Sequence, residues 1–385
     1  ADLAGERSDA PAAQLAVGPQ HVMEVVESRL AFFNKNSGAK LFEQALDDFF
    51  APVGAVQRDI PNEIFVGQSA VAFDEFTERF VVATRELNFA DQSSHLLIAV
   101  SDDSNPQGQW EKHRINVEEF DKFYFTHTSL GLDADAIYVT GDMYTWDVRF
   151  HHVSIVTLEK DALLDGDSNS LTYFDVDFNT PHMKLQPAVM HGALPGDPMY
   201  FVQSSSHNGA QLRVVEMTDK LSAEPTFSRS NVRVPHYRLP PDATQPDGPL
   251  LHTLDTRILN AAWRDDRLVT VHNVGADEVA RARWYELNTA GEKRVLAQVG
   301  EINPGPGIHT YFPSVEIAAS GDLGMTYIQS SANEFVSMYV IGQGADAETG
   351  QLESPVLVKA GEAPLKIIRP DGTEPGSIQS GFQSG

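Results

Sequence analysis

The sequence predicts an all-β chain with a β-propeller as its architecture. Short runs of apolar, aromatic and β-branched residues recur along the chain, whereas long stretches with helical periodicity are scarce. Clusters of Gly, Pro, Asn and Asp separate these runs, as expected for turns between strands. The runs fall into groups about 45 to 55 residues apart, the repeat expected when each group forms one four-stranded blade. A pair of β-sandwiches is the alternative fold.

The expected strands follow one another from residue 21 onward. Each has an apolar or β-branched centre, and together they cover residues 21–35, 79–87, 95–102, 136–144, 152–160, 198–205, 210–217, 267–274, 281–288, 314–320, 323–331 and 336–343. Only "SGAKLFEQALDDFF" (37–50) is helix-like, as a short local excursion. The groups predict blades near residues 12–46, 68–116, 126–177, 182–235, 256–302 and 309–364. Residues 1–385 are expected to form one propeller domain with six visible blades, and seven in a complete ring.

The stretch "SSHLLIAVSDDSNPQGQW" (93–110) illustrates one hairpin of such a blade. His95 to Ser101 form the apolar strand, and "DDSNPQG" supplies residues that favour turn geometry. Trp110 then follows as an aromatic anchor that packs between blades. The stretch is expected to be structural, because nothing in it requires chemistry.

Composition limits the class of partner. The 385 residues include 54 Asp plus Glu against 28 Lys plus Arg, a formal net charge of −26 that repels nucleic acid and anionic membrane surfaces. This acidic excess fits solubility, and it also fits carboxylate sites for calcium. Cysteine is absent, which excludes disulfides, thiolate catalysis and sulfur-ligated zinc or iron clusters.

The chain shows no segment that would insert into a bilayer. No apolar run approaches the ~20 residues that a membrane-spanning helix needs. The start, "ADLAGERSDAPAAQLAVG", has neither an initiator Met nor a signal-peptide core, as expected of a processed chain or a piece of a longer protein.

Five stretches carry a resemblance to known proteins. In order they are "LAVGPQHVMEVVESRLAFFNKNSGAKL" (15–41), "LIAVSDDSNPQGQW" (97–110), "LGLDADAIYVTGDMY" (130–144), "ARWYEL" (282–287) and "YFPSVEIAASGDLGMTYIQSS" (311–331). Together they resemble a family of secreted bacterial β-propeller proteins, most of them uncharacterised. The resemblance covers most of the chain and implies a propeller with an extracellular or periplasmic location. It implies no single activity, because members share a fold rather than a function.

Two positions depart from the pattern of that family. Gln68-Ser69 stands where relatives have Asp-Pro, and His127-Thr128 stands where they have Tyr-Pro. Both positions would face the central channel, so an acidic ion site that relatives build there does not carry over. Relatives also continue past "QSGFQSG" with a final blade. Either that blade lies beyond Gly385, or the ring closes with fewer blades.

Histidine is the main candidate for chemistry. The sequence contains no H-E-x-x-H, no G-x-S-x-G and no phosphate-binding glycine loop. Four histidines stand where the innermost strand of a blade would begin: His127, His182, His252 and His309. Two tyrosines and an arginine lie near them in sequence: Tyr124, Tyr311 and Arg257. If these residues converge, His127 or His309 could abstract a proton, Arg257 could hold a substrate carboxylate and Tyr311 could protonate the leaving oxygen. Propeller-fold lyases of uronic-acid polysaccharides look similar. In the alternative interpretation, each histidine caps a blade end through backbone hydrogen bonds.

Metal sites have weaker support in the sequence. Three histidines could hold zinc, but no local spacing indicates it, and the adjacent His151 and His152 would face opposite sides of a regular strand.

One segment resembles half of a calcium loop. Asp165, Asp167 and Asn169 of "DGDSNS" (165–170) offer oxygen ligands at alternate positions, but the glycine and the bidentate glutamate of such a loop are missing. The segment is interpreted as a surface turn, or as a calcium site completed by Asp175 or Asp177.

The four tryptophans divide into two kinds. Trp110, Trp263 and Trp284 lie in or beside expected strands, where packing between blades explains them. Trp146, in "GDMYTWDVRF", lies in a loop with Tyr144 and Arg149. These three residues are the candidates for exposed ligand contacts, together with His182 and His252.

Two functions remain open at this stage. The first is a secreted or cell-surface recognition module that binds a polysaccharide or a protein ligand through its loops. The second is a carbohydrate-active enzyme, a lyase of uronic-acid glycans that uses His127, His309, Tyr311 and Arg257. Convergence of the histidines would favour the enzyme, and their dispersal would favour the binding module.

Overall fold

The computed structural model describes residues 13–26, 28–56, 64–116, 122–164, 173–180 and 182–366. Strands dominate these residues. The helices among them are the α-helices α1 (Leu46–Phe50) and α2 (Lys160–Leu164) and the 3-10 helix η1 (Ala51–Val53). The all-β class predicted from the sequence is confirmed. Within the described ranges, every helix is too short to cross a membrane.

The described residues divide into two compact units. Unit 1 takes the residues up to Lys184 together with Asp219–Thr226, and unit 2 takes Leu185–Thr218 and the residues from Phe227 onward. A short segment late in the sequence therefore belongs to the unit formed by the first half of the chain. The single domain expected from the sequence remains a prediction.

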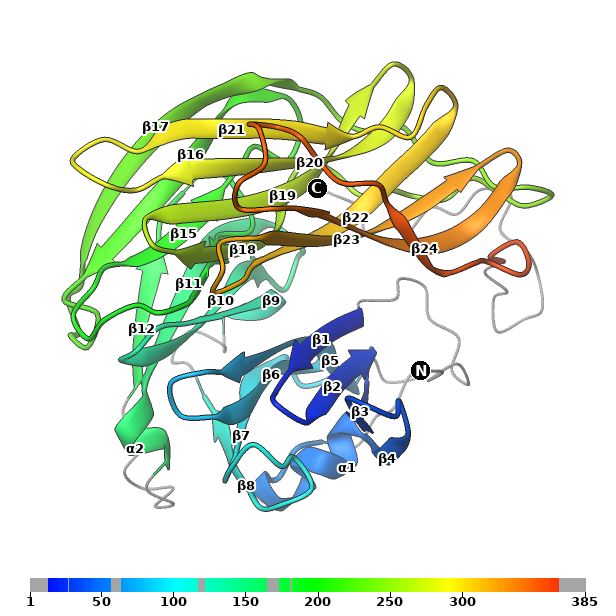
Figure 1. Cartoon of the computed structure of the whole chain (residues 1–385). Helices are drawn as coiled ribbons and strands as arrows, with labels where there is room; N and C mark the ends of the chain where they lie inside the picture. The colour runs from blue at the N-terminus through cyan, green and yellow to red at the C-terminus, as the bar shows by residue number, and fades with distance from the viewer. Residues whose placement is uncertain are drawn as a thin grey trace. The chain divides into compact units, whose positions relative to one another are not determined.

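Unit 1 contains three groups of four antiparallel strands (Figure 1). The first group is β1 (Ala13–Val17), β2 (His21–Val26), β3 (Arg29–Asn34) and β4 (Lys40–Ala45). The second is β5 (Ile64–Asp74), β6 (Arg79–Asn88), β7 (Ser93–Ser101) and β8 (Trp110–Ile115). The third is β9 (Phe123–Leu132), β10 (Ala136–Thr145), β11 (Phe150–Glu159) and β12 (Tyr173–Phe178). In each group, strands that follow in sequence are neighbours in space.

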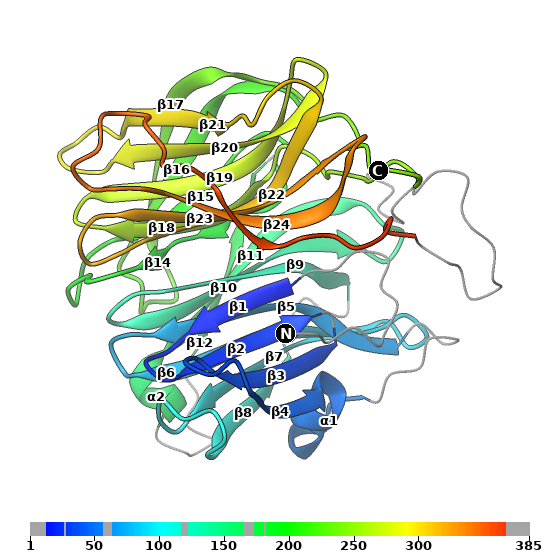
Figure 2. The ribbon, with the colours of Figure 1, turned by 45° about the vertical axis from the view of Figure 1, so that its right-hand side comes forward.

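Unit 2 repeats this plan (Figure 2). One sheet has the order β13 (Gln186–Pro187), β15 (Met199–Gln203), β16 (Gly209–Thr218) and β17 (Thr226–Tyr237). The strands β18 (Ile258–Arg264), β19 (Arg267–Ala276), β20 (Val279–Asn288) and β21 (Val295–Ile302) pair in sequence order, and β14 (Val189–Met190) runs parallel to β18. The last sheet is β22 (Ile308–Ile317), β23 (Leu323–Ser331), β24 (Glu334–Gln343) and β25 (Val356–Lys359).

These repeated antiparallel groups form a β-propeller arrangement, as predicted. In the described residues, four separate sheets have four strands each: β1–β4, β5–β8, β13 with β15–β17, and β22–β25. The groups β9–β12 and β18–β21 repeat the same pairing without standing as separate four-stranded sheets. The structure thus gives four separate sheets where the sequence predicted six visible blades.

The expected helix over 37–50 is mostly wrong. Residues 40–45 form the strand β4, and only the last five residues are helical. Phe42 pairs with Phe32 of β3, and their rings stack at 5.2 Å. Cross-strand aromatic contacts of this kind stabilise a strand against a modest local helix propensity. Tertiary packing therefore outweighs the helical pattern here.

Trp110 is a packing anchor, as predicted. Its ring stacks on Phe32 at 5.9 Å and meets Phe49 edge-on at 5.3 Å, within the apolar core that joins the first two sheets of unit 1. The indole N–H donates to the carbonyl of Pro106 at 2.9 Å, inside the turn before β8. In that turn, a Cβ on Gly108 would lie 2.4 Å from Asp102 Oδ1, so a larger residue there would require the exposed Asp102 side chain to move.

Two tryptophans pack the core of unit 2 in the same manner. Trp284 is 1% exposed on β20, among the apolar side chains of strands β18 to β24. Trp263 stacks on Tyr200 and donates its indole N–H to Thr289 Oγ1 at 2.8 Å. Both indoles are therefore structural, as the sequence predicted.

A buried ionic cluster ties the segment Asp219–Thr226 into unit 1. Lys220 Nζ lies 2.5 Å from Asp133 Oδ2 and 2.8 Å from Asp135 Oδ2. Lys160, the first residue of α2, meets Asp74 at 2.8 Å. Apart from Asp135, the ionic side chains of this cluster are 5% exposed or less. The turn at residues 133–136, between β9 and β10, is thus part of a buried ionic cluster.

Candidate functional site

The candidate site in unit 1 begins with two backbone positions of unusual conformation. Gln68 in β5 and His127 in β9 have φ of 58° and 56°, values that non-glycine residues rarely adopt. Gln68 Oε1 accepts hydrogen bonds from the His127 backbone N–H at 2.9 Å and from the Thr126 hydroxyl at 2.7 Å. The two positions that depart from the resembled family's pattern are therefore in direct contact. Strain of this kind is often retained where a residue has a functional role.

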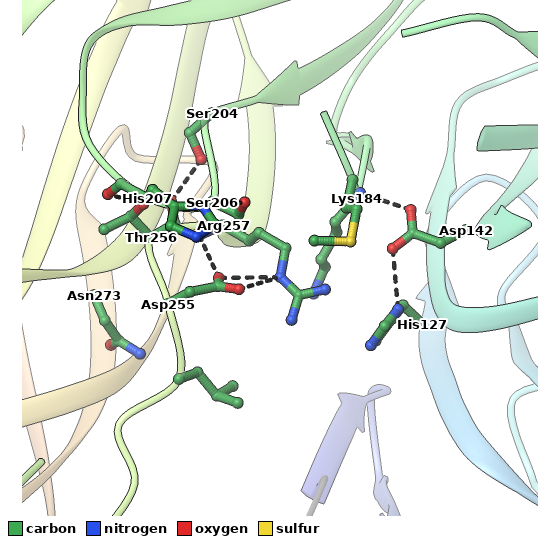
Figure 3. Close-up of polar contacts among 12 residues, drawn as sticks. His127, Asp142, Lys184, Ser204, Ser206, His207, Asp255, Thr256, Arg257 and Asn273 are labelled. Atoms are coloured by element: carbon green, nitrogen blue, oxygen red, sulfur yellow. Dashed lines mark hydrogen bonds and ion pairs between the residues drawn. The ribbon is translucent and has the colours of Figure 1, made fainter. Parts of the chain in front are cut away.

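A buried carboxylate orients the His127 ring. Asp142 Oδ2 on β10 lies 3.0 Å from His127 Nδ1, and the aspartate side chain is fully buried whereas the histidine side chain is 18% exposed. Asp142 Oδ1 accepts the backbone N–H of Lys184 at 2.7 Å. Figure 3 shows the carboxylate with its two oxygens directed to these two partners. We call Gln68, His127, Asp142 and Lys184 the His127 site.

Irregular pairing of the strands creates this arrangement. The register shifts between Gly67 and Ala70 where β5 pairs with β6, and between Thr140 and Asp142 where β10 pairs with β9. A bulge turns a side chain out of the regular alternation, so Gln68 and Asp142 can both reach the backbone or ring of a neighbouring strand. Gly141 permits the second bulge, because a Cβ there would lie 2.2 Å from the Phe125 ring.

Aromatic side chains adjoin the His127 site. The Tyr144 ring lies 6.3 Å from the His127 ring and stacks on Tyr124 at 5.7 Å. Trp146 contacts Tyr124 at 5.3 Å and Phe89 at 5.7 Å, and it is half-buried. This aromatic cluster offers ring faces beside a polar group, the combination that sugar-binding surfaces use.

Arg149 lies in the tight turn that follows β10. Its side chain is 80% exposed and pairs with Asp147 at 3.0 Å. An ion pair this exposed contributes little to stability, so Arg149 can change partners at small cost. The sequence-based grouping of Tyr144, Trp146 and Arg149 therefore falls on one hairpin, β10–β11.

The interior of unit 1 also holds a cation near the aromatic cluster. Arg85 on β6 is buried, and burial lowers the pKa of its guanidinium to about 10. Arg85 therefore remains charged at neutral pH. Its positive charge acts on Tyr124, although burial dominates and raises the pKa of that phenol.

In unit 2, the predicted residue Arg257 is held by a neighbouring carboxylate. Asp255 accepts the Arg257 backbone N–H at 2.8 Å and contacts its Nε at 2.8 and 3.0 Å (Figure 3). The Arg257 side chain is 12% exposed. Asp255 therefore fixes the orientation of the Arg257 guanidinium by holding its Nε edge.

A buried polar network holds the loop that carries Arg257. Thr256 donates its hydroxyl to the carbonyls of Ser205 and His207, and its own carbonyl accepts from Ser204 Oγ at 2.6 Å and from His272 Nδ1 at 2.8 Å. Burial lowers the pKa of His272 to about 3, so this ring is neutral at physiological pH. With Nδ1–H donated, Nε2 accepts from the Tyr285 hydroxyl at 2.9 Å.

His309 and Tyr311 lie inside β22. His309 is 4% exposed, and its Nδ1 accepts the backbone N–H of Ala280 at 3.1 Å. Burial, with the nearby Arg281, lowers the pKa of His309. Tyr311 is 2% exposed, its hydroxyl lies 3.1 Å from Ser330 Oγ, and burial raises its pKa to about 12. Backbone bonding and packing thus account for the contacts of both side chains.

The other two candidate histidines are half-buried. His182 donates its backbone N–H to Thr180 Oγ1 in unit 1, and His252 Nδ1 accepts the backbone N–H of Leu254 in unit 2. His127 and His182 belong to unit 1, whereas His252 and His309 belong to unit 2. Convergence of the four stays a prediction.

The metal predictions receive no support from the described residues. Asp165, Asp167 and Asn169 lie outside them, and so does most of the expected calcium loop. No group of three or more His, Asp or Glu side chains that could hold a metal occurs in the described part of the chain.

The expectation that His151 and His152 face opposite sides is wrong. A register shift next to Tyr144 brings their Nδ1 atoms to 2.7 Å, while His152 Nε2 meets Asp177 at 2.9 Å. The bulge, which sequence periodicity does not reveal, lets the two adjacent rings contact each other.

Asp142 and Gln68 are the site residues that sequence reasoning missed. Asp142 lies in the apolar strand "AIYVTGDMY" (136–144). A single aspartate in such a strand indicates a buried partner, and the prediction from the sequence did not use this signal. Gln68 was noted only as a departure from a family pattern.

Comparisons with known proteins agree on the fold. No protein-family model and no curated protein matches the chain. A Hadza microbial sialidase superposes with a TM-score of 0.52 at 12% identity, over 85% of this chain and 64% of the sialidase, so the chain spans less than two thirds of that protein.

Two further structures are similar at lower scores. A Trypanosoma rangeli sialidase gives a TM-score of 0.47 at 8% identity, over 82% of this chain and 51% of the other. The extracellular domains 1-2 of Drosophila Semaphorin 1b give 0.43 at 6% identity, over 94% and 81%. Identities this low show the likeness of fold alone.

Proposed function

We propose that this chain is a secreted or cell-surface β-propeller recognition module that binds a polysaccharide through the His127 site and the adjoining aromatic cluster of unit 1. A sugar ring would stack on Trp146 or Tyr144, while its hydroxyl or carboxylate groups would bond to the exposed Arg149. A protein ligand at the same surface is the other partner of a recognition module.

One observation carries this proposal: an oriented, partly exposed imidazole adjoins a set of ring faces. His127 is 18% exposed and anchored at Nδ1 by a buried carboxylate, and Tyr144 lies 6.3 Å away. Carbohydrate sites combine aromatic platforms with a few fixed polar groups. A structure of similar fold with a TM-score of 0.52 is named as a sialidase, which fits a carbohydrate ligand without identifying it.

A second candidate function is a lyase of uronic-acid polysaccharides. It is favoured by the contact between His127 and Asp142, because a carboxylate behind an imidazole is a common arrangement for a general base. His127 would take the proton beside the sugar carboxylate, Tyr144 would protonate the leaving oxygen, and a carbon–carbon double bond would form as the glycosidic bond breaks. In this alternative Tyr144 takes the acid role that the sequence predicted for Tyr311, and the roles predicted for Arg257 and His309 stay predictions.

The test is a panel of neutral and uronic-acid polysaccharides. Binding is measured by titration calorimetry, and cleavage is followed by the ultraviolet absorbance of an unsaturated sugar. Binding without new absorbance supports the recognition module, and absorbance that disappears in His127→Ala supports the lyase. If no polysaccharide binds wild-type protein, the proposal is wrong.

Three finer points belong to the same proposal. We infer six blades, counting β9–β12 and β18–β21 as blades beside the four separate sheets. A secreted location follows only from the resemblance to secreted propellers. Calcium at Asp165, Asp167 and Asn169 is tested by whether added calcium raises the unfolding temperature of wild-type protein but not of D165N/D167N.

A further inference from the structure

We propose that Lys220 and Asp133 condense into an amide cross-link within unit 1, with the loss of one water molecule. Asp135 and Tyr138 take part in the reaction. The four side chains meet where the segment Asp219–Thr226 contacts the turn between β9 and β10. This inference goes beyond the recognition function, because it involves no ligand.

The nucleophile and its target are in contact. Lys220 Nζ lies 2.5 Å from Asp133 Oδ2, and both side chains are 5% exposed or less. A carboxyl C–O bond is about 1.2 Å long, so Asp133 Cγ lies within about 3.7 Å of Nζ. Rotation about the last bonds of the lysine side chain brings Nζ over the carboxyl plane, at the roughly 3–3.5 Å from which a nucleophile attacks.

Hydrogen bonds prepare the Asp133 carboxyl group for attack. Oδ1 accepts the backbone N–H of Asp135 at 2.8 Å and that of Ala136 at 2.9 Å. Two N–H groups at these distances stabilise the negative charge that develops on Oδ1 when Cγ becomes tetrahedral. Oδ2 accepts the Tyr138 hydroxyl at 2.8 Å, so a proton donor faces the oxygen that leaves. Burial, together with Asp133, raises the pKa of Tyr138 well above its ordinary value, which keeps this hydroxyl protonated.

Asp135 is the base. Its Oδ2 lies 2.8 Å from Lys220 Nζ, on the same nitrogen that faces Asp133. A lysine attacks a carbonyl carbon as the neutral amine, so one proton must first leave the ammonium group. The Asp135 carboxylate is in position to accept it.

The reaction balances without an oxidant or a co-reactant. Asp135 takes one proton from the ammonium group, and the amine forms the bond between Nζ and Cγ. The bond between Cγ and Oδ2 then breaks. Oδ2 leaves as water with two protons, one from the nitrogen and one returned by Asp135, while Tyr138 stabilises the departing oxygen and ends protonated. A buried cation and a buried anion become one neutral amide.

Burial and proximity both favour the amide over the ion pair. Two charges removed from water lose their hydration, and condensation eliminates both of them. Groups held in a reactive geometry act at an effective concentration of roughly 10⁵ M or more, far above that of the water that would reverse the reaction.

The other buried lysine of the cluster lacks part of this arrangement. Lys160 Nζ lies 2.8 Å from Asp74 Oδ2, and both side chains are 4% exposed or less. Asp74 Oδ1 accepts the backbone N–H of Phe76 at 3.0 Å, where Asp133 Oδ1 accepts two N–H groups. Lys160 Nζ also donates to the backbone carbonyl of Asp133, which cannot act as a base. The cross-link is therefore expected at Lys220 and not at Lys160.

The cross-link would restrain a long stretch of chain. Asp133 and Lys220 are 87 positions apart in the sequence, and the chain has no cysteine from which a disulfide could form. A covalent bond between such distant residues restricts the unfolded chain and so favours the folded one.

The first experiment weighs the intact wild-type protein under denaturing conditions by mass spectrometry. We expect a mass lower than that of the sequence by one water molecule, and a branched peptide in a protease digest that joins Asp133 to Lys220. A mass equal to that of the sequence would overturn the proposal, and so would a water loss located at other residues. This measurement needs no variant.

The second experiment uses Lys220→Arg, which retains the positive charge but replaces the amine by a weakly nucleophilic guanidinium. This variant should show the full mass of its sequence. It should also migrate more slowly than wild type in a denaturing gel, because the wild-type chain keeps a closed loop. Lys160→Arg is the matched control and should keep the water loss. A water loss that persists in K220R would contradict the cross-link.

The third experiment tests the base with Asp135→Asn, which has nearly the same size but cannot accept the proton. The ratio of cross-linked to uncross-linked chain, read from the mass spectrum, should fall at least tenfold, while circular dichroism shows that the variant is folded. A wild-type ratio in D135N would overturn the role of Asp135. None of these measurements involves a polysaccharide, so failure of the recognition function and failure of the cross-link are observed separately.

Discussion

At the scale of single residues, the candidate site depends on side chains that depart from the strand pattern. Asp142 is a fully buried carboxylate in an apolar strand, and Gln68 and His127 hold left-handed backbone conformations. Each departure carries a cost in free energy, of order 1–3 kcal/mol for a strained backbone position. Hydrogen bonds that Gln68 Oε1 accepts from Thr126 and His127, and one that Asp142 Oδ1 accepts from the Lys184 backbone, offset part of that cost.

Trp146→Ala should weaken polysaccharide binding by about tenfold or more, since the loss of one stacked ring is worth roughly 1–2 kcal/mol. Titration calorimetry measures the change, and Trp146→Phe should retain part of the affinity. Leu194→Ala, which removes a side chain 66% exposed in unit 2, is the control for general surface effects. Equal affinity of wild type and Trp146→Ala would rule out the aromatic platform.

His272 should make the fold sensitive to acid. The folded ring has a pKa of about 3, below the model-peptide value of 6.5, so below pH 6.5 the unfolded chain binds a proton that the folded chain does not. Stability from this group is complete above pH 6.5 and falls at about 1.4 kcal/mol per pH unit as the pH drops toward 3. Urea unfolding of His272→Gln at pH 7 and at pH 4.5 should show a smaller loss than wild type. An equal loss of unfolding free energy between pH 7 and pH 4.5 in His272→Gln and in wild type would contradict the low pKa assigned to His272.

At the scale of elements, the sequence predicted the central strands well and the outer strands poorly. β6, β10 and β20 are buried along nearly their whole length, and their apolar runs in the sequence predicted them as strands. β17 alternates irregularly between exposed and buried positions and contains Pro235, so no period marks it as a strand. β4 has the local character of a helix and is a strand because of its neighbour β3.

The segment Asp219–Thr226 should be a stability element of unit 1. Lys220→Ala removes the cation that meets Asp133 and Asp135 and leaves a buried carboxylate poorly compensated, at a cost of about 3–5 kcal/mol. The free energy of unfolding in urea measures it. Lys359→Ala is the matched control, because its pair with Glu362 is 73% and 78% exposed and should matter by less than about 0.5 kcal/mol. A loss of unfolding free energy in Lys220→Ala as small as that in Lys359→Ala would contradict a stabilising role of the buried ionic cluster.

At the scale of the whole molecule, composition and repeat spacing predicted the fold class but not the site. Turn residues and Trp110 indicated a propeller blade, because a tight turn and a packed core each require particular residue types close together in the sequence. The contact of Gln68 with His127, and that of Asp142 with the same ring, join residues far apart in sequence through bulges. A single sequence carries no periodicity for such contacts.

The net charge of −26 should oppose an acidic ligand over long range. Raising the ionic strength from about 10 mM to about 150 mM shortens the screening length to roughly 8 Å, so affinity for a uronic-acid polysaccharide should rise while affinity for a neutral one stays level. Calorimetry at the two salt concentrations tests this. Affinity for the acidic polysaccharide that falls with salt would show that local ion pairs outweigh the overall charge.

The most direct test of the central claim is to map where a bound polysaccharide lies. Nuclear magnetic resonance shifts of the Trp146 indole and the His127 imidazole are followed while the best ligand of the polysaccharide panel is added. The account predicts that both signals move together and saturate with the calorimetric affinity. Saturable binding that leaves both signals unchanged would contradict recognition at the His127 site.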